Sequence, residues 1–151
     1  MNERPTTSPE KKEIGLPHAK EIWLMDDSEP GGEVMGRLLG PVLDETGYSY
    51  GYYSRGAKVL EEINKRREAG NGQPHVIIMD GRFSPEDPIR YGSRAIETIR
   101  ALDITQPTIL AYSSDPELNE NMLKAGANQV LSKPSSAEEI NAMVGDIITA
   151  K

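Results

Sequence analysis

The sequence predicts one α/β domain, built on a five-stranded parallel sheet with helices on both faces. Two observations predict this class. Short apolar segments alternate with longer segments whose apolar residues recur at helical spacing, and 151 residues is a common length for one domain with a substantial core. Such alternation is typical of right-handed βαβ crossovers, which produce a parallel sheet.

The N-terminal segment is predicted to be an arm. Residues 1–19 contain three prolines and no apolar periodicity, so we expect them to be flexible and residues 20–151 to form the domain. The first strand is predicted at residues 22–25, an apolar run that leads directly into Asp26 and Asp27.

The first helix and the second strand follow. Residues 28–30, Ser-Glu-Pro, supply an N-cap and first-turn residues for a helix that ends near Gly47. Its weak points are Gly31, Gly32 and Pro41. Residues 48–53 are rich in tyrosine and predict a strand, although Gly51 interrupts it. A charged helix is then predicted over residues 57–69.

The third predicted strand covers residues 75–80 and ends in a carboxylate. Its continuous apolar run indicates burial on both faces, and ligands gather beyond the carboxyl ends of such strands. Asp80 is therefore a candidate site residue. A long polar loop over residues 82–90 leads to a helix whose predicted inward residues are Ala95, Ile96, Ile99 and Leu102.

The C-terminal part completes the alternation. A strand over residues 108–112 ends in Ser113 and Ser114, and Asp115 then caps a short helix that closes at Gly126. A fifth strand is predicted at residues 129–132, just before Lys133-Pro134. Serines three residues ahead of glutamates begin the last helix, whose apolar face consists of Ile140, Met143, Val144 and Ile147.

The composition restricts the partners. With 24 acidic and 17 basic residues the net charge is −7, which argues against direct nucleic-acid binding and against anionic membranes. The chain has no cysteine and two histidines, so thiolate and histidine-rich metal sites are excluded. No apolar run reaches the length of a membrane span or a signal sequence, so we expect a cytoplasmic domain.

Several strand ends deliver polar groups to one edge of the predicted sheet. Asp26, Asp27 and Asp80 would meet there with a serine hydroxyl and the ammonium group of Lys133. Three adjacent carboxylates repel one another unless a cation neutralises them, and an oxygen-rich site of this kind suits Mg²⁺. The set fits the transfer of a phosphoryl group to a carboxylate.

These residues, in this order, resemble the receiver domain of two-component response regulators. The resemblance rests on the acidic pair after the first strand, Asp80, the serine after the fourth strand, and Lys133-Pro134. The Ala-Gly-Ala-Asn turn at residues 125–128 adds to it, and the similarity covers about residues 20–149. It implies a stand-alone receiver domain with a flavodoxin-like (βα)5 sandwich of strand order 2-1-3-4-5.

The resemblance also implies a role for each site residue. Asp80 would accept a phosphoryl group from a histidine kinase or a histidine phosphotransfer protein, while Lys133 and Ser113, or alternatively Ser114, contact that group. Mg²⁺ would be the cofactor. Its implied ligands are the carboxylates of Asp26, Asp27 and Asp80 and the backbone carbonyl of Arg82.

As a family member the chain would be a signalling domain rather than an enzyme, although it assists its own phosphorylation and dephosphorylation. It would act on an unknown downstream protein as a monomer or weak dimer. The family often has a cis bond before the proline that follows the lysine, so a cis Lys133-Pro134 bond is expected.

Three departures from the family pattern matter. The loop after Asp80 is longer than usual, and the connection from Ser113 to Gly126 is shorter. Val130 occupies the position where the family often has an aromatic switch residue, so we expect the signal to leave through backbone or helix movement.

Arg82 and Asp115 occupy positions that modulate phosphoryl lifetime in the family. Our hypothesis is that these two side chains pair across the pocket mouth and hinder the attacking water.

Two other functions stay open. A degenerate receiver could bind proteins without phosphorylation, as the long loop and Val130 suggest. A phosphohydrolase that forms an aspartyl phosphate is disfavoured, because such enzymes need a second acid two residues after the nucleophile. Neither Asp26 nor Asp80 has an acid at that position.

Overall fold

The computed structural model describes residues 17–102, 104 and 106–150. Within that part, five strands form one parallel sheet of order β2-β1-β3-β4-β5, which confirms the predicted fold class and strand order. The strands are β1 (Ala19–Met25), β2 (Ser49–Tyr53), β3 (Pro74–Asp80), β4 (Thr108–Tyr112) and β5 (Gln129–Val130).

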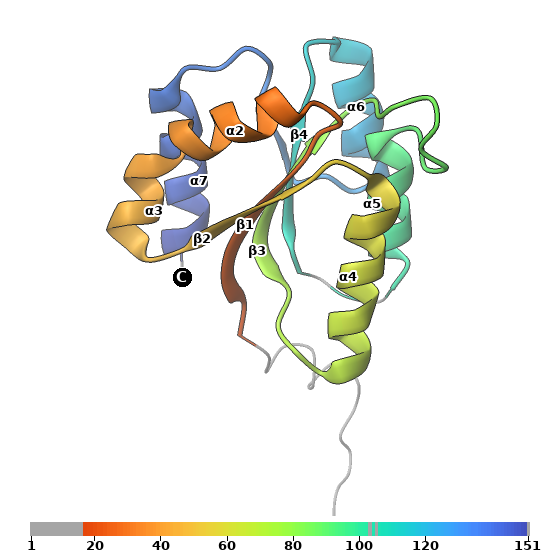
Figure 1. Ribbon diagram of the computed structural model, residues 1–151, viewed down its shortest axis with the longest axis horizontal. Helices are drawn as coiled ribbons and strands as arrows, with labels where there is room; N and C mark the ends of the chain where they lie inside the picture. The colour runs from red at the N-terminus through yellow and green to blue at the C-terminus, as the bar shows by residue number, and fades with distance from the viewer. Residues whose placement is uncertain (1–16, 103, 105, 151) are drawn as a thin grey trace, which may run out of the picture.

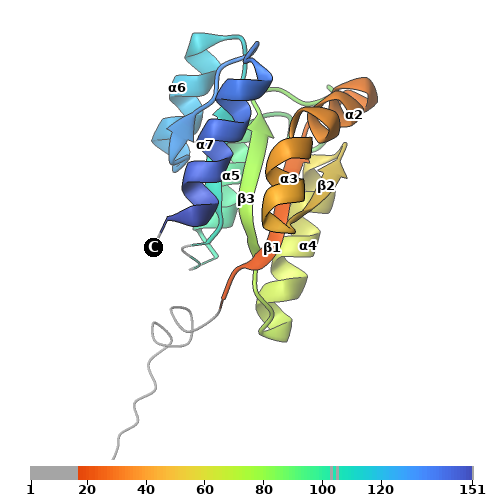
Figure 2. The same cartoon turned by 90° about the vertical axis from the view of Figure 1, so that its left-hand side faces the viewer.

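Helices cover both faces of the sheet. Figure 1 shows one layer to the left of the strands and a second layer to the right, and Figure 2 views the molecule from the side of the first layer. The first layer contains α2 (Glu29–Leu38), α3 (Gly40–Thr46) and α7 (Ala137–Thr149). The second contains α4 (Gly56–Ala69), α5 (Gly92–Arg100) and α6 (Pro116–Ala125).

The core consists of two apolar clusters, one on each face of the sheet. Ile78 of β3 packs in the cluster beneath α2, α3 and α7, whereas its neighbours Ile77 and Met79 pack in the cluster beneath α4, α5 and α6. This alternation follows from the pleat, which points successive side chains to opposite faces. The central strands are therefore buried on both sides, as their continuous apolar sequences predict.

The first predicted helix is divided into two. Helix α2 ends at Leu38, and α3 begins at Gly40 with Pro41 in its first turn. Proline has no N–H to continue the helical hydrogen bonds and its ring crowds the preceding turn, so an unbroken helix to Gly47 was a wrong expectation. Gly47 does end α3, with a left-handed φ of 75°.

Other boundaries differ at the ends of strands. The β4·β5 ladder stops at Val130, so β5 is shorter than the predicted segment 129–132, although the N–H of Leu131 still donates to the carbonyl of Ala111. Residues 1–16 of the expected arm lie outside the described residues, and β1 begins at Ala19. The predicted caps of α6 and α7 are confirmed, the latter as a full capping box between Ser136 and Glu139.

The long loop between β3 and α5 is anchored at both ends and at its tip. Its two ends meet in an antiparallel bridge between Arg82 and Tyr91. Phe83 is buried in the core, and the carboxylate of Asp87, only 3% exposed, accepts hydrogen bonds from the N–H groups of Gly56 (2.6 Å) and Ile89 (3.0 Å). These contacts tie the loop to the start of α4.

Candidate functional site

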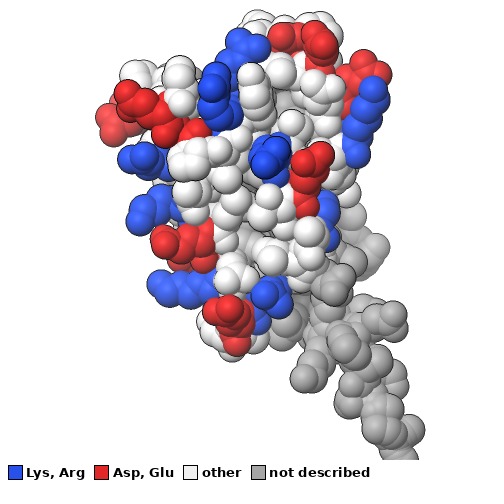
Figure 3. All heavy atoms as spheres, turned by 90° about the vertical axis from the view of Figure 1, so that its right-hand side faces the viewer, with Lys and Arg blue, Asp and Glu red and all other residues white. Residues whose placement is uncertain are grey.

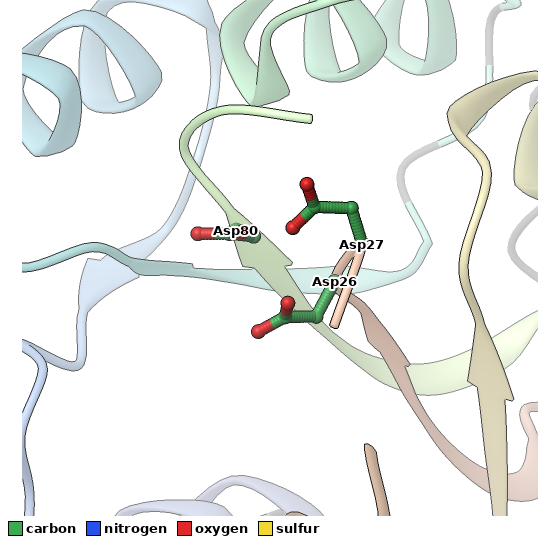
Figure 4. Close-up of side chains that lie close together, drawn as sticks. All are labelled: Asp26, Asp27 and Asp80. Carbon is green, nitrogen blue, oxygen red and sulfur yellow. The ribbon is translucent and has the colours of Figure 1, made fainter. Parts of the chain in front are cut away.

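Three carboxylates gather where β1 and β3 end. Asp26 and Asp27 follow β1, Asp80 closes β3, and one oxygen from each lies within 4.8 Å of the other two. Figure 4 shows the three carboxylates pointing to the same side, beyond the strand ends. Asp26 and Asp80 are 3% and 8% exposed, whereas Asp27 is open to solvent. The predicted convergence of these acids is confirmed.

Strand register explains this convergence. Met25 of β1 pairs with Met79 of β3, so the next residues, Asp26 and Asp80, extend the same pairing to the edge of the sheet. Met25 and Met79 point into the core cluster beneath α4, α5 and α6. Because the pleat alternates, the side chains of Asp26 and Asp80 point to the other face, toward the α2, α3 and α7 layer.

Lys133 lies between two of the carboxylates. Its Nζ is 3.3 Å from Asp26 Oδ2 and 3.4 Å from Asp80 Oδ1, and it lies 4.9 Å from the centre of the Tyr112 ring. Burial lowers the pKa of Lys133, but the charges of Asp80 and Asp26 outweigh it and the net shift is upward. The ammonium group therefore stays charged. The following Lys133-Pro134 bond is cis, as expected.

The surroundings of Asp80 disfavour the charged form of its carboxyl group. Burial and the neighbouring carboxylate of Asp26 raise its pKa to about 6, although Lys133 and the N–H of Gly81 act in the opposite direction. One ammonium group thus does not neutralise the three acids. Carboxylate oxygens in a half-open cluster are the ligands that Mg²⁺ binds in proteins, so the residues present fit this cation.

A pocket of about 400 Å³ opens over the acids. One wall is polar and comes from the three aspartates and Lys133, and the other is apolar and comes from α2. Val34 on that wall is 46% exposed. The remaining lining residues are Ser28, Pro30, Gly31, Met35, Leu38 and Tyr112.

Ser113 is the better placed of the two candidate hydroxyl residues. It is buried at the end of β4, whereas Ser114 is exposed. A Cβ added at Gly81 would lie 3.1 Å from Cβ of Ser113, so this serine is packed against the end of β3, beside Asp80. Its Oγ accepts a hydrogen bond from the N–H of Asp115 at 3.1 Å.

Ser113 is also connected to α6. Its carbonyl accepts hydrogen bonds from Nδ2 of Asn119 at 2.9 Å and from the N–H of Lys133 at 3.2 Å. Asp115 caps α6 by accepting from the N–H of Glu117. The first turn of α6 is therefore fastened to the residue that borders the site.

The remaining candidate residues, Arg82, Asp115 and Val130, do not line the pocket over the acids. Arg82 is exposed, and among the contacts of the described residues it makes no ion pair with Asp115. The pairing of these two residues is thus not formed in this structure. Val130 is half-buried and packs against the core cluster beneath α4, α5 and α6.

Two tyrosines near the site were not predicted as site residues from the sequence. Tyr112 lines the pocket and contacts Lys133, while the hydroxyl of Tyr52 donates a hydrogen bond to the carbonyl of Asp26 at 2.7 Å. The strand pattern placed both residues in a sheet without indicating which face they occupy. Asp80 and Tyr112 are paired in the β3·β4 ladder, so their side chains lie on the same face of the sheet. This pairing would have identified Tyr112 as a neighbour of the site.

Fold and site together define a flavodoxin-like domain with an acidic triad and a lysine at the carboxyl edge of its sheet. The sequence pattern of the response regulator receiver domain matches residues 22–145, so the chain belongs to this family. Receiver domains are signalling domains of two-component systems and not classical enzymes.

Individual relatives agree with this assignment. The chain is 27% identical over 133 residues to the chemotaxis protein CheY of Halobacterium salinarum, covering 87% of this chain and 99% of CheY. Among solved structures, the receiver domain of a putative response regulator NarL from Mycobacterium tuberculosis has a TM-score of 0.65 and 24% identity, covering 89% of this chain and 100% of that one.

A second solved structure is the receiver domain of a sensor histidine kinase from Pseudomonas aeruginosa, with a magnesium ion coordinated in its active-site cleft. It has a TM-score of 0.67 and 24% identity, covering 86% of this chain and 98% of that one. Within the part of the chain that the structure describes, no helix is long and apolar enough to cross a membrane.

Proposed function

We propose that this receiver domain accepts a phosphoryl group on Asp80 from a histidine kinase or a histidine phosphotransfer protein, in a reaction that requires Mg²⁺. The observation that carries the proposal is the cluster of Asp26, Asp27 and Asp80 with a single lysine inside it. Such a cluster has a negative excess that a divalent cation would neutralise. The magnesium ion in the Pseudomonas aeruginosa receiver domain supports the same choice of cation.

The proposed reaction is an in-line displacement. A carboxylate oxygen of Asp80 attacks the phosphorus of a phosphohistidine, an O–P bond forms, and the N–P bond breaks. The imidazole keeps the bonding electron pair and leaves as a neutral ring once its other nitrogen is protonated. Lys133 neutralises charge on the transferred group, and a bound Mg²⁺ would neutralise the remaining charge on its oxygens.

The ligands of the cation follow from the same cluster. We propose that Asp26, Asp27 and Asp80 hold it through carboxylate oxygens and that Arg82 adds its backbone carbonyl. The donor protein would cover the pocket from the side of α2, where exposed Val34 offers an apolar contact beside the acids.

The proposed output is a shift in the population of a binding face. The Ser113 hydroxyl now accepts from Asp115, and moving it to a phosphoryl oxygen would break the bond that joins β4 to the cap of α6. The start of α6 would then adjust. This route needs no aromatic switch residue and is therefore compatible with Val130.

The test of phosphorylation is an intact-mass measurement. The protein is incubated with acetyl phosphate and Mg²⁺ beside Asp80→Asn, which has nearly the same shape but no nucleophilic carboxylate. We expect the wild type alone to gain the mass of one phosphoryl group. An equal gain in the variant would move the acceptor elsewhere, and no gain in either would refute the proposal.

A second candidate function is a phosphorylation-independent protein-binding module. The observation that favours it is Val130, which leaves the usual switch position without an aromatic ring. Beryllofluoride, a phosphoryl mimic, distinguishes the two functions, because only a working receiver binds it together with Mg²⁺. We expect binding, with chemical-shift changes at Ser113 and in the first turn of α6.

Phosphoryl lifetime is proposed to depend on Arg82. Arg82 and Asp115 are not paired here, and a phosphoryl group on Asp80 would draw the exposed guanidinium of Arg82 toward the pocket mouth. Pairing with Asp115 there would hinder the attacking water. Arg82→Ala should shorten the lifetime of the phosphorylated protein, whereas an unchanged decay rate would remove this role from Arg82.

A further inference from the structure

Asp26 is held by all of its polar groups. Its N–H donates to the carbonyl of Tyr53 at 3.1 Å, its Oδ1 accepts from the N–H of Ser28 at 2.9 Å, and its Oδ2 faces Lys133. Its carbonyl accepts the hydroxyl of Tyr52 at 2.7 Å. Among contacts of the described residues, this is the only hydrogen bond that the carbonyl accepts.

Asp27 differs sharply from Asp26. Its side chain is exposed, and among the described residues it makes no hydrogen bond or ion pair. The direction of its carboxylate therefore depends on the backbone that carries it. The carbonyl of Asp26 and the N–H of Asp27 belong to one planar peptide group, so the bond from Tyr52 fixes the plane that orients Asp27.

Tyr52 is itself held firmly. It pairs with Leu24 in the β1·β2 ladder, and its ring lies so close to Gly32 of α2 that a Cβ there would be 2.6 Å from the ring. Burial raises the pKa of Tyr52, and the charges of Asp26, Glu29 and Asp27 add to the shift. The strand pairing and the packing against Gly32 hold the hydroxyl beside the carbonyl of Asp26.

We infer that Tyr52 is a positioning residue for the cation site, which fixes the peptide plane between Asp26 and Asp27 and so directs the Asp27 carboxylate toward Asp80. The inference rests on the proposed Mg²⁺-dependent function. Tyr52 does not contact the reacting atoms, and it acts through the backbone of a proposed ligand.

Tyr50 provides a matched control. It lies on the same strand, and its hydroxyl also donates to a backbone carbonyl at 2.7 Å, but that carbonyl belongs to Gly32 in α2. Tyr52→Phe and Tyr50→Phe therefore each remove one hydroxyl and one hydrogen bond of equal length. Only the first removes a contact to the acidic pair.

The experiment is a Mg²⁺ titration followed by amide chemical shifts. We expect Tyr52→Phe to raise the dissociation constant for Mg²⁺ by about two- to tenfold, the range that one neutral hydrogen bond supplies. Tyr50→Phe should leave it unchanged. In the metal-free protein, ¹⁵N relaxation should show increased motion of the Asp27 amide in Tyr52→Phe only.

The possible results distinguish failure of the proposed Mg²⁺-dependent function from failure of the role inferred for Tyr52. A wild-type protein that binds no Mg²⁺ refutes the proposed function and, with it, the role of Tyr52. A wild type that binds Mg²⁺ beside a Tyr52→Phe variant of equal affinity refutes the role of Tyr52 alone. Equal weakening in both variants would assign the effect to general loosening of α2 and β2, and would likewise overturn the inference.

Discussion

The two ends of the sheet treat ionisable side chains in opposite ways. At the carboxyl end, Asp26 and Asp80 are buried together with Lys133 at 3.3 and 3.4 Å. At the amino end, the rings of His18 and His75 are stacked 3.9 Å apart, and the hydroxyl of Tyr48 is 2.8 Å from Nδ1 of His75. These two rings are all the histidines of the chain.

The consequences for charge differ accordingly. Burial, followed by the proximity of His18, lowers the pKa of His75 to about 4, so this ring stays neutral near pH 7. Burial and Asp26 raise the pKa of Asp80 to about 6, yet at pH 7 the group is still charged. The carboxyl end thus keeps charges that folding alone would not favour, which is typical of functional sites.

Figure 3 gives a third point of reference, the face that carries α4 and α5. Basic and acidic side chains are interspersed over it, and uncharged side chains cover much of the area between these charged groups. On α4, for example, Lys58 and Glu61 pair in solvent at 3.5 Å. Such an exposed pair contributes little to stability, in contrast to the buried carboxylates of Asp26 and Asp80 at the carboxyl end.

The largest expected effect comes from removing the charge of Asp80. In metal-free buffer at pH 7.5, Asp80→Asn should raise the free energy of unfolding by an amount that approaches about 3 kcal/mol at most, because the raised pKa shows that the charged form is disfavoured in the fold. Urea unfolding measures this. A destabilised variant would show that the attraction between Asp80 and Lys133 outweighs the cost of burying Asp80 and its repulsion by Asp26.

The next effect is that of the cation. If Mg²⁺ binds the acidic cluster, it should stabilise the wild type by about 2.7 kcal/mol at a concentration one hundred times its dissociation constant. Asp80→Asn should lose most of this gain. Ca²⁺-free MgCl₂ titrations of the melting temperature would measure it, and an equal gain in both proteins would place the cation elsewhere.

Much of the carboxyl end of the sheet could be predicted from sequence. The βα alternation determined the sheet, and parallel strands bring their carboxyl ends to one edge, so the meeting of Asp26, Asp27, Asp80 and Lys133 followed from strand ends alone. Caps such as Asp115 could be predicted because their chemistry is local to a few residues.

What the sequence did not predict depends on contacts between distant segments. The hydrogen bond from Tyr52 to Asp26 joins two strands, and the anchoring of Asp87 on Gly56 joins a loop to a helix start. Both require a strand register or a loop path that no local pattern encodes. The division of the first helix was a different failure, because Pro41 was recognised as a weak point but not as a break.

A smaller effect concerns how tightly the carboxyl end is supported. Gly32→Ala would place a Cβ 2.6 Å from the Tyr52 ring, so it should cost about 1–3 kcal/mol through overpacking. Gly40→Ala is the control, since no atom lies within 4 Å of its added Cβ. Thermal unfolding of both variants measures the difference. Similar stabilities would mean that the Tyr52 ring can shift at little energetic cost.

The smallest effect is the pH dependence, which sets the two ends against each other. The folded-state pKa of Asp80 lies above its unfolded value, so the folded state binds more protons between about pH 4 and 6 and gains stability as the pH falls through that range. His75 has a folded-state pKa below its unfolded value, so stability is lost as the pH falls below about 6.5.

These opposing slopes should nearly cancel in the metal-free wild type and separate in variants. Asp80→Asn removes the opposing carboxyl contribution, so its stability should fall more steeply than that of the wild type between pH 7 and 5. His75→Gln removes the more strongly shifted histidine but leaves His18, whose pKa burial also lowers, so its stability should fall less than that of the wild type over the same interval. Urea midpoints at three pH values test both signs, and parallel curves for the two variants would show that the sheet ends do not differ in the way their pKa shifts indicate.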